Sequence, residues 1–244
     1  MAKIGRIETL PDPSALARHV ADWMTAEALA AKGAFRVSLS GGSTPKALFA
    51  LLASEPFVGR FPWSKVSWYW GDERFVPYDH PDSNYRMTRE TMLSKVPAPS
   101  ENIHPVPADG TPDDAAARYE RTLQAAYGAA VLDPARPLFD ITLLGLGPDG
   151  HTASLLPGEP VLEERKRWVA AVSHGRPEVR ITMTYPVIES SRKVAFLVAG
   201  KEKAAIFKAV RAGGSDVPAA RVEPVGELIW FVDRAAAGPG AVSM

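Results

Sequence analysis

The segment of this sequence best suited to chemistry is Gly145–His151. It reads Gly-Leu-Gly-Pro-Asp-Gly-His and follows the apolar run Phe139–Leu144, which predicts a buried strand. An imidazole titrates near neutral pH, so His151 at a strand end is suited to remove a proton from water. Asp149 lies two residues earlier, where it can accept the ring N–H and fix the tautomer. Alternatively, Asp149 only caps the turn and His151 only packs; His174, in another strand-end loop, is the rival base.

The same segment also satisfies the pattern G-x-G-x-x-G, which is typical of dinucleotide-binding folds. Such folds place an acidic residue about 20 residues further on, at the end of the next strand. The next predicted strand, Trp168–Val172, ends in Ser-His-Gly instead. The Pro-Gly pair at 157–158 also comes too soon for a crossover helix. We therefore interpret the match as accidental.

A second segment, residues 40–45, joins a predicted strand to a predicted helix through Gly41 and Gly42. Free backbone N–H groups and the helix dipole at such a turn favour an anion, and glycine lets a phosphate approach the backbone. Ser43 and Thr44 add hydroxyl donors. The equally weighted alternative is an ordinary strand-to-helix turn with Thr44 as the N-cap.

Further charged residues follow other predicted strands. Asp72, Glu73 and Arg74 come together after one strand, where Arg74 can bind an anion or stabilise an oxyanion, or can simply pair with the adjacent acids. Lys201 begins a predicted helix, where a cation is unfavourable by roughly 0.3–1 kcal/mol because of the helix dipole. Either a bound anion or a neighbouring acidic residue would offset this cost. Arg180, at the edge of its strand, is ambiguous on sequence alone.

The composition narrows the class of protein. The 244 residues fit one large domain or two small ones. The 28 basic residues equal the 28 acidic ones, so the chain has no net electrostatic field that would attract nucleic acid or a membrane. The chain has no cysteine, which excludes a disulfide framework, a thiolate nucleophile and a cysteine-ligated metal. The N-terminal residues lack a signal-peptide pattern and no apolar run is long enough to span a bilayer, so we expect a cytoplasmic protein.

These segments must be positioned by alternating strands and helices. Short apolar runs predict strands over residues 35–39, 65–70, 139–144, 168–172, 180–184, 193–198 and 228–231. Helical periodicity predicts intervening helices, including one that Asp12 caps and one over residues 201–211. Strands separated by helices imply a largely parallel α/β sheet, either open and doubly wound or closed as a TIM barrel. In both, loops at the carboxyl ends of the strands converge on one rim.

Taken together, the motifs resemble those of the 6-phosphogluconolactonase family. The segments that carry the resemblance are Ser-Leu-Ser-Gly-Gly-Ser-Thr-Pro (38–45), Trp-Gly-Asp-Glu-Arg (70–74), Ser-Asn-Tyr (83–85), Leu-Gly-Leu-Gly-Pro-Asp-Gly-His-Thr-Ala-Ser-Leu-Leu-Pro-Gly (144–158), Arg-Ile-Thr-Met-Thr (180–184) and Ala-Gly-Lys-Glu-Lys (199–203). They span most of the chain in the family's order.

The resemblance implies a Rossmann-like, open and mostly parallel α/β sheet flanked by helices, formed by residues 1–244 as one domain. It implies hydrolysis of 6-phosphogluconolactone in the oxidative pentose phosphate pathway, without cofactor or metal. Residues 41–44, Arg180 and Lys201 would hold the phosphate, and Asp72 would lie near the substrate. Arg74 would lie near the sugar-acid end and His151 would be the base. We expect a monomer, with an oligomer left open.

The related glucosamine-6-phosphate deaminases are the nearest alternative. Their corresponding motif resembles Asp-Gly-His-Ile-Ala-Phe-Asn-Glu-Pro-Gly, in which the Glu completes a proton relay. Here that position is Leu156, which cannot transfer a proton. A binding protein that senses a sugar phosphate without turning it over is the second alternative.

Overall fold

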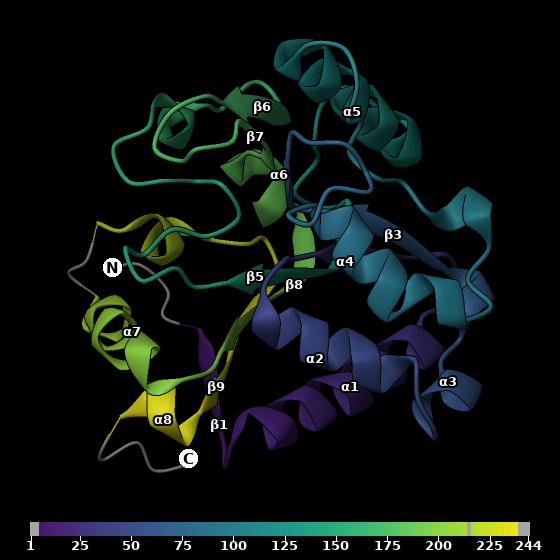
Figure 1. The fold of residues 1–244 in the computed structure, drawn as a ribbon, viewed down its shortest axis with the longest axis vertical. Helices are drawn as coiled ribbons and strands as arrows, with labels where there is room; N and C mark the ends of the chain where they lie inside the picture. The colour runs from purple at the N-terminus through teal and green to yellow at the C-terminus, as the bar shows by residue number, and fades with distance from the viewer. Residues whose placement is uncertain (1–4, 214–215, 239–244) are drawn as a thin grey trace.

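The computed structural model describes residues 5–213 and 216–238 (Figure 1). Its main sheet has six strands, all paired in parallel: β1 (Arg6–Leu10), β2 (Phe35–Leu39), β3 (Val66–Trp70), β5 (Phe139–Gly145), β8 (Ser191–Val198) and β9 (Glu227–Asp233). A smaller sheet contains β4 (Asp72–Arg74), β6 (Val169–Val172) and β7 (Arg180–Met183), paired antiparallel. The main sheet is open, which excludes the TIM barrel and confirms the doubly wound prediction.

The strand order β1-β9-β8-β5-β2-β3 creates a switch point between β2 and β5. From β2 the chain moves outward to β3, whereas from β5 it moves the opposite way through β8 and β9. The loops that leave β2 and β5 therefore turn to opposite sides and leave a crevice between them. Ligands bind in such crevices at the carboxyl ends of the strands in open α/β sheets.

Helices connect the strands and flank the sheet: α1 (Pro13–Ala30), α2 (Ser43–Leu52), α3 (Phe57–Arg60), α4 (Asn84–Thr91), α5 (Pro112–Tyr127), α6 (Tyr185–Glu189), α7 (Ala204–Arg211) and α8 (Arg234–Ala237). The side chain of Asp12 accepts the N–H of Ala15, which confirms the predicted N-cap of α1. Helices α1 and α2 pack side by side below the sheet in Figure 1, and α5 lies beside β6 and β7. Among the described residues, no helix is long and apolar enough to cross a membrane.

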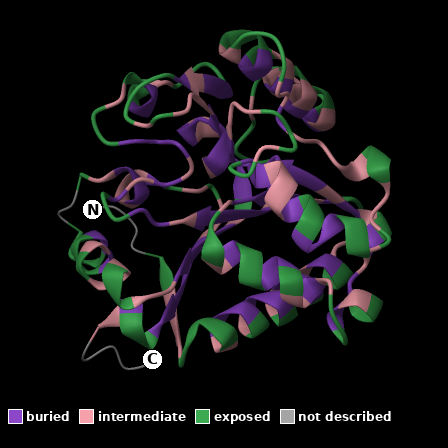
Figure 2. Cartoon of the chain, viewed as in Figure 1, coloured by how far each residue is buried: buried purple, intermediate pink, exposed green. Residues whose placement is uncertain are grey.

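The core lies on the central strands, whose continuous apolar runs are buried between layers (Figure 2). Phe196 on β8 and Trp230 on β9 occupy paired positions, and their rings stack with centroids 3.9 Å apart. Aromatic pairs in such contact contribute about 0.5–1.5 kcal/mol beyond the area that they bury. The outer faces of α1 and α2 carry the exposed residues, as the amphipathic pattern requires.

The structure differs from the sequence prediction in several elements. Strand β1 and the short helices α3, α6 and α8 were not predicted, and residues 72–74, expected as a loop, form the short strand β4. The strands predicted near 168–172 and 180–184 exist, but they pair antiparallel with each other and do not join the main sheet. Helix α2 begins at Ser43 with Gly42 as its N-cap, so the alternative interpretation was wrong in placing the N-cap at Thr44.

Candidate active site

A pocket of about 330 Å³ opens at the switch point. It is lined by the residues that follow β2, by the turn after β5 and by the end of β8, together with side chains of β4 and β7. Its charged lining residues besides His151 are Asp72, Arg74, Arg176, Arg180 and Lys203. Four cations and one acid therefore make this pocket locally positive in a chain of zero net charge.

The turn at residues 41–44 forms one wall of the pocket. Gly42 has a φ of 106°, and its carbonyl accepts the N–H of Lys46 in the first turn of α2. A Cβ on Gly41 would lie 2.0 Å from Oδ1 of Asn84, so only glycine lets this turn approach the start of α4. The turn thus presents the amino end of a ten-residue helix to the pocket, an arrangement that attracts anions.

His151 faces the same pocket from the turn that follows β5. The N–H of Gly147 bonds to the carbonyl of His151 at 2.8 Å and closes this turn. Oδ1 of Asp149 lies 2.5 Å from Nδ1 of the His151 ring and 3.1 Å from the backbone nitrogen of His151. Because an ionised carboxylate at Nδ1 holds the proton on that nitrogen, Nε2 is the atom that can accept a proton. The predicted pairing of Asp149 with His151 is therefore present.

Two glycines of the G-x-G-x-x-G pattern have packing roles in this turn. A Cβ on Gly147 would lie 2.0 Å from Nδ1 of His151, so the imidazole lies against bare backbone. Gly150 has a φ of 82°, and a Cβ there would lie 2.4 Å from Cβ of Val217. The two glycines thus make room for the His151 ring and the Val217 side chain. This accounts for the G-x-G-x-x-G pattern without a bound dinucleotide.

Arg176, which the sequence analysis missed, also contacts this pair. Its Nη2 lies 2.9 Å from Oδ2 of Asp149 and 3.1 Å from Nδ1 of His151. Partial burial alone would raise the pKa of Asp149, but hydrogen bonds from Arg176 and His151 outweigh it and hold that pKa well below its usual range. Asp149 is therefore ionised at neutral pH. His174, the rival base, is exposed and does not line the pocket.

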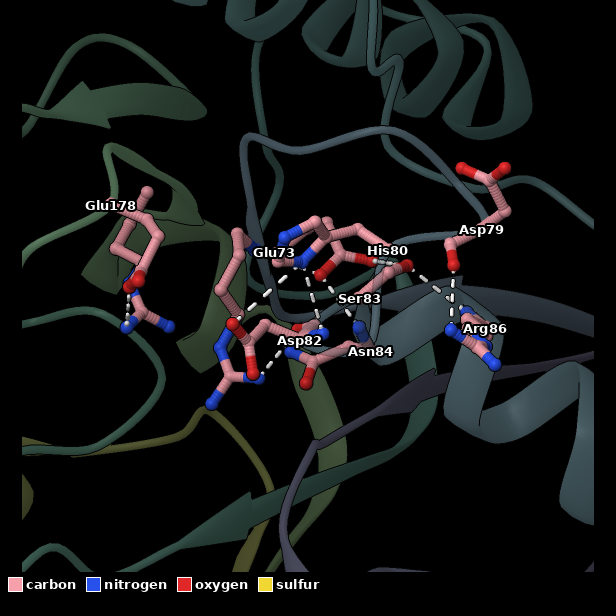
Figure 3. Close-up of polar contacts among 10 residues, drawn as sticks. Glu73, Asp79, His80, Asp82, Ser83, Asn84, Arg86 and Glu178 are labelled. Atoms are coloured by element: carbon pink, nitrogen blue, oxygen red, sulfur yellow. Dashed lines mark hydrogen bonds and ion pairs between the residues drawn. The ribbon is translucent and has the colours of Figure 1, made fainter.

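Arg74 and Arg180 are paired across β4 and β7, which brings two guanidinium groups to the same wall. Nη1 of Arg74 donates to the carbonyl of Asp82 at 2.6 Å, and Nη2 of Arg180 lies 3.2 Å from a carboxylate oxygen of Glu178 (Figure 3). Nε of Arg180 is buried and has no hydrogen-bond partner within the described ranges. Burial lowers the pKa of Arg180, and the charge of Arg74 lowers it further. A bound anion would compensate the buried charge of Arg180 and offset its repulsion by Arg74.

Glu73 is buried behind this wall and holds the start of α4 (Figure 3). Its carboxylate accepts the N–H groups of Asn84 at 2.7 Å and Tyr85 at 2.8 Å, the hydroxyl of Ser83 at 3.1 Å, and the N–H of Arg74. Burial raises the pKa of Glu73 to about 7, although the backbone hydrogen bonds favour the ionised form. Glu73 therefore shapes its loop and does not line the pocket.

Asp72, in contrast, does line the pocket. Its Oδ2 accepts the hydroxyl of Ser154 at 2.7 Å, and its backbone carbonyl accepts the amide of Asn84 at 3.0 Å. These contacts tie β4 to the turn after β5 and to α4. The carboxylate of Asp72 is thereby fixed where it can accept hydroxyl groups of a ligand.

Lys203, and not the predicted Lys201, lines the pocket. Residues Lys201–Lys203 form a 3₁₀ turn, and α7 begins only at Ala204. Side chains two residues apart on a 3₁₀ turn point in different directions, since the turn has three residues. Lys201 is exposed, whereas Lys203 is half-buried. The other predicted site residues lie in the pocket or, like Asp149, beside it, but the lysine that lines the pocket is Lys203 and not Lys201.

Within the described parts of the chain, no group of three or more His, Asp or Glu side chains could hold a metal ion. The polar groups that converge on the pocket are instead suited to an anionic organic molecule. Its cations and helix terminus are suited to bind negative charge, Asp72 can accept hydroxyl groups, and His151 can remove a proton.

Comparison with known proteins agrees with this geometry. Residues 11–230 match the family described as glucosamine-6-phosphate isomerases/6-phosphogluconolactonase. A 6-phosphogluconolactonase from Nostoc is 41% identical over 94% of this chain and 96% of its own length. One from Synechocystis is 42% identical over 86% of each chain. The structure of 6-phosphogluconolactonase from Trypanosoma cruzi superposes with a TM-score of 0.86, at 28% identity and 99% coverage of both chains.

Proposed function

The chain belongs to the family of glucosamine-6-phosphate isomerases and 6-phosphogluconolactonases, and we propose that it hydrolyses 6-phosphoglucono-1,5-lactone to 6-phosphogluconate. The observation that carries the proposal is His151, held by Asp149 with Nε2 available, in a pocket rich in cations. A phosphorylated lactone needs both features, an anion site at one end and a base for water at the other. The reaction belongs to the oxidative pentose phosphate pathway.

Leu156 favours the lactonase over the deaminase. It is buried and lines the pocket at the position where the deaminase motif carries a Glu. The ring opening and proton shuttling of the deaminase need an acid there, and an apolar side chain cannot supply it. Water activation by a single histidine needs no such group.

The phosphate end of the substrate is assigned to the wall formed by residues 41–44, Arg180 and Lys203. Backbone N–H groups at the start of α2 and two cations suit a dianionic phosphate. Asp72 accepts hydroxyl groups of the sugar. Arg74 lies closer to the lactone carbonyl, where it stabilises the oxyanion.

The catalytic step follows from this orientation. Nε2 of His151 accepts a proton from a water molecule while the oxygen of that water bonds to the lactone carbonyl carbon. The bond between that carbon and the ring oxygen then breaks, and the His151 imidazolium returns the proton to the departing oxygen, which becomes a hydroxyl. Asp149 stabilises the imidazolium and keeps the ring oriented; such general-base catalysis contributes about 10²–10⁴-fold.

We also propose that residues 1–244 act as one unit, as a monomer, in the cytoplasm. The pocket draws its lining from both sheets, which supports one functional unit. The chain has no cysteine that could form a disulfide, which is compatible with a reducing compartment.

The test is acid release from freshly prepared 6-phosphogluconolactone in a pH-stat, with spontaneous hydrolysis subtracted and no nucleotide present. The wild-type chain should accelerate acid release, and His151→Ala should lower kcat by about 10²–10⁴-fold. Binding of 6-phosphogluconate to the variant should remain close to that of the wild type. Binding without turnover in the wild type would identify a sensor instead, and ammonia release from glucosamine 6-phosphate would identify a deaminase.

A further inference from the structure

Tyr185, the first residue of α6, donates a hydrogen bond from its buried hydroxyl to the carbonyl of Pro218 at 2.9 Å. The next residue, Ala219, donates its N–H to the carbonyl of Gly150 at 2.9 Å, in the turn that carries His151. We infer that Tyr185 is a positioning residue that holds the catalytic turn through this chain of hydrogen bonds. The inference rests on the proposed function only in assigning His151 as the base.

The first two hydrogen bonds are linked because they share one peptide group. The carbonyl of Pro218 and the N–H of Ala219 belong to the same rigid plane. Tyr185 therefore fixes one edge of this plane, and the catalytic turn is bonded to the opposite edge. If the hydroxyl of Tyr185 is lost, the plane is held from one side only.

The peptide group between Gly150 and His151 continues the chain. Its carbonyl accepts the bond from Ala219, and its N–H donates to Oδ1 of Asp149 at 3.1 Å. The same oxygen lies 2.5 Å from Nδ1 of the His151 ring. Hydrogen bonds in series polarise and strengthen one another. Because the imidazole is attached at one end of this second plane, a tilt of the plane changes the direction in which Nε2 points.

Packing acts at the same point as the hydrogen bonds. A Cβ on Gly150 would lie 2.4 Å from Cβ of Val217, so the Val217 side chain lies directly against the backbone of the turn. This contact blocks movement of the turn toward Val217, since closely packed atoms resist compression. The hydrogen bond from Ala219 opposes movement the other way.

Tyr185 is a firm anchor because its side chain is buried and its neighbours are held in turn. The guanidinium groups of Arg165 and Arg221 lie over its ring, 5.3 and 5.5 Å from the centroid. Arg221 ends the 3₁₀ turn Pro218–Arg221 and pairs with Glu163 at 2.8 Å, which fixes the other end of that turn. Burial raises the pKa of Tyr185, so its hydroxyl keeps its proton and remains a donor.

Tyr185 also connects two walls of the pocket. It lies just after β7, which carries Arg180 in the proposed phosphate site, whereas the turn bonded to it carries the base. A substrate held by its phosphate presents its carbonyl to Nε2 of His151 only if the distance between the two walls is fixed. The link from Tyr185 to the turn supplies this constraint.

The test compares Tyr185→Phe with a matched control, Tyr127→Phe. Tyr127 is also buried, and its hydroxyl accepts the N–H of Asp133 at 2.7 Å, but it lies outside the pocket. Each substitution removes one hydroxyl that is bonded to the backbone and leaves the ring in place. The readouts are kcat and KM in the pH-stat, the backbone amide signals of Ala219 and His151 in the NMR spectrum without substrate, and a thermal melt.

In Tyr185→Phe we expect kcat to fall about three- to tenfold and KM to stay within about twofold, because the base is displaced and the phosphate wall is not. The amide protons of Ala219 and His151 should both move upfield as their hydrogen bonds lengthen. Tyr127→Phe should also lower the melting temperature, but it should leave kcat and both amide signals at the wild-type values. Val217→Ala, which loosens the turn and keeps the Tyr185 hydroxyl, should lower kcat as well.

An unchanged kcat or an unmoved His151 amide signal in Tyr185→Phe would overturn the inference, as would an equal loss of kcat in Tyr127→Phe. If Tyr185→Phe does not fold, Val217→Ala decides, and an unchanged kcat in that variant overturns the link. If the wild type releases no acid from the lactone but the His151 amide signal moves in Tyr185→Phe, the proposed function fails while the positioning role of Tyr185 stands.

Discussion

Gly147→Ala tests whether catalysis depends on how closely the His151 ring lies against the turn. The new Cβ would lie 2.0 Å from Nδ1 and 2.2 Å from Cε1 of the ring. Non-bonded atoms of this kind need about 3.5 Å, so the ring must retreat by roughly 1.5 Å. Such a movement disturbs the hydrogen bond between Nδ1 and Asp149, now 2.5 Å long, and displaces Nε2 in the pocket by a similar amount.

The expected result is a large loss of turnover with little loss of binding. A misplacement of about 1 Å at a reacting group costs roughly 10²-fold in rate, and a tenfold change corresponds to about 1.4 kcal/mol. We therefore expect kcat to fall about 100-fold, equivalent to about 2.7 kcal/mol of transition-state stabilisation. The phosphate wall lies on other elements, so the affinity for 6-phosphogluconate should change by less than about threefold.

The assay pairs kcat in the pH-stat with calorimetric binding of 6-phosphogluconate and a thermal melt. Gly147 does not have a positive φ, so alanine imposes no backbone strain there. Gly33→Ala is the matched control because its Cβ would meet nothing within 4 Å. If Gly147→Ala keeps the wild-type kcat, the ring position is not what limits the reaction and the reasoning is wrong.

Two further predictions concern the lysines at 201 and 203 and the buried acid behind the arginine wall. Lys203→Ala should raise KM roughly tenfold, since a pocket cation is lost, whereas Lys201→Ala should leave KM within about twofold; equal effects in initial-rate measurements would contradict the pocket geometry. The pKa of Glu73 is about 7 in the folded protein against 4.5 in the reference state, so the unfolded chain binds fewer protons between these values. The contribution of Glu73 to stability should therefore fall by up to about 3 kcal/mol as pH rises from 4.5 to 7. Urea unfolding of wild type and Glu73→Gln at pH 5 and 7.5 measures this, and a pH-independent difference between them would refute it.

The sequence predicts the main sheet well where apolar runs are long. Strand β2 has the predicted bounds, and β5 extends the predicted strand by one residue, because a strand buried on both faces leaves a continuous apolar signal. The missed elements have no such signal. Strand β4 is the charged triplet Asp-Glu-Arg, and its pairing with β7 depends on contacts more than 100 residues apart.

The residues of the candidate site could be predicted where they belong to one local motif. They were missed where their place in the site depends on tertiary contacts. His151 and Asp149 are two residues apart, so one turn determines their pairing. Arg176 reaches them from 25 residues away, through a loop with no periodic pattern, and the only sequence signal was a cation four residues before Arg180. The choice between the neighbouring lysines depended on a 3₁₀ turn, and helix boundaries are the least certain part of a sequence prediction.

The pairing of pocket cations bears on how product leaves. Hydrolysis turns a lactone with a charged phosphate into an acid with an additional carboxylate, so a pocket of unpaired cations would bind product more tightly than substrate. Here Arg176 is paired with Asp149, and Arg180 with Glu178. The attraction that remains is short-ranged, because the chain has no net charge and solution ions screen charges beyond about 8 Å. The pair of Arg176 and Asp149 adds no net charge beside His151, so the carboxylate formed by hydrolysis gains less additional attraction there.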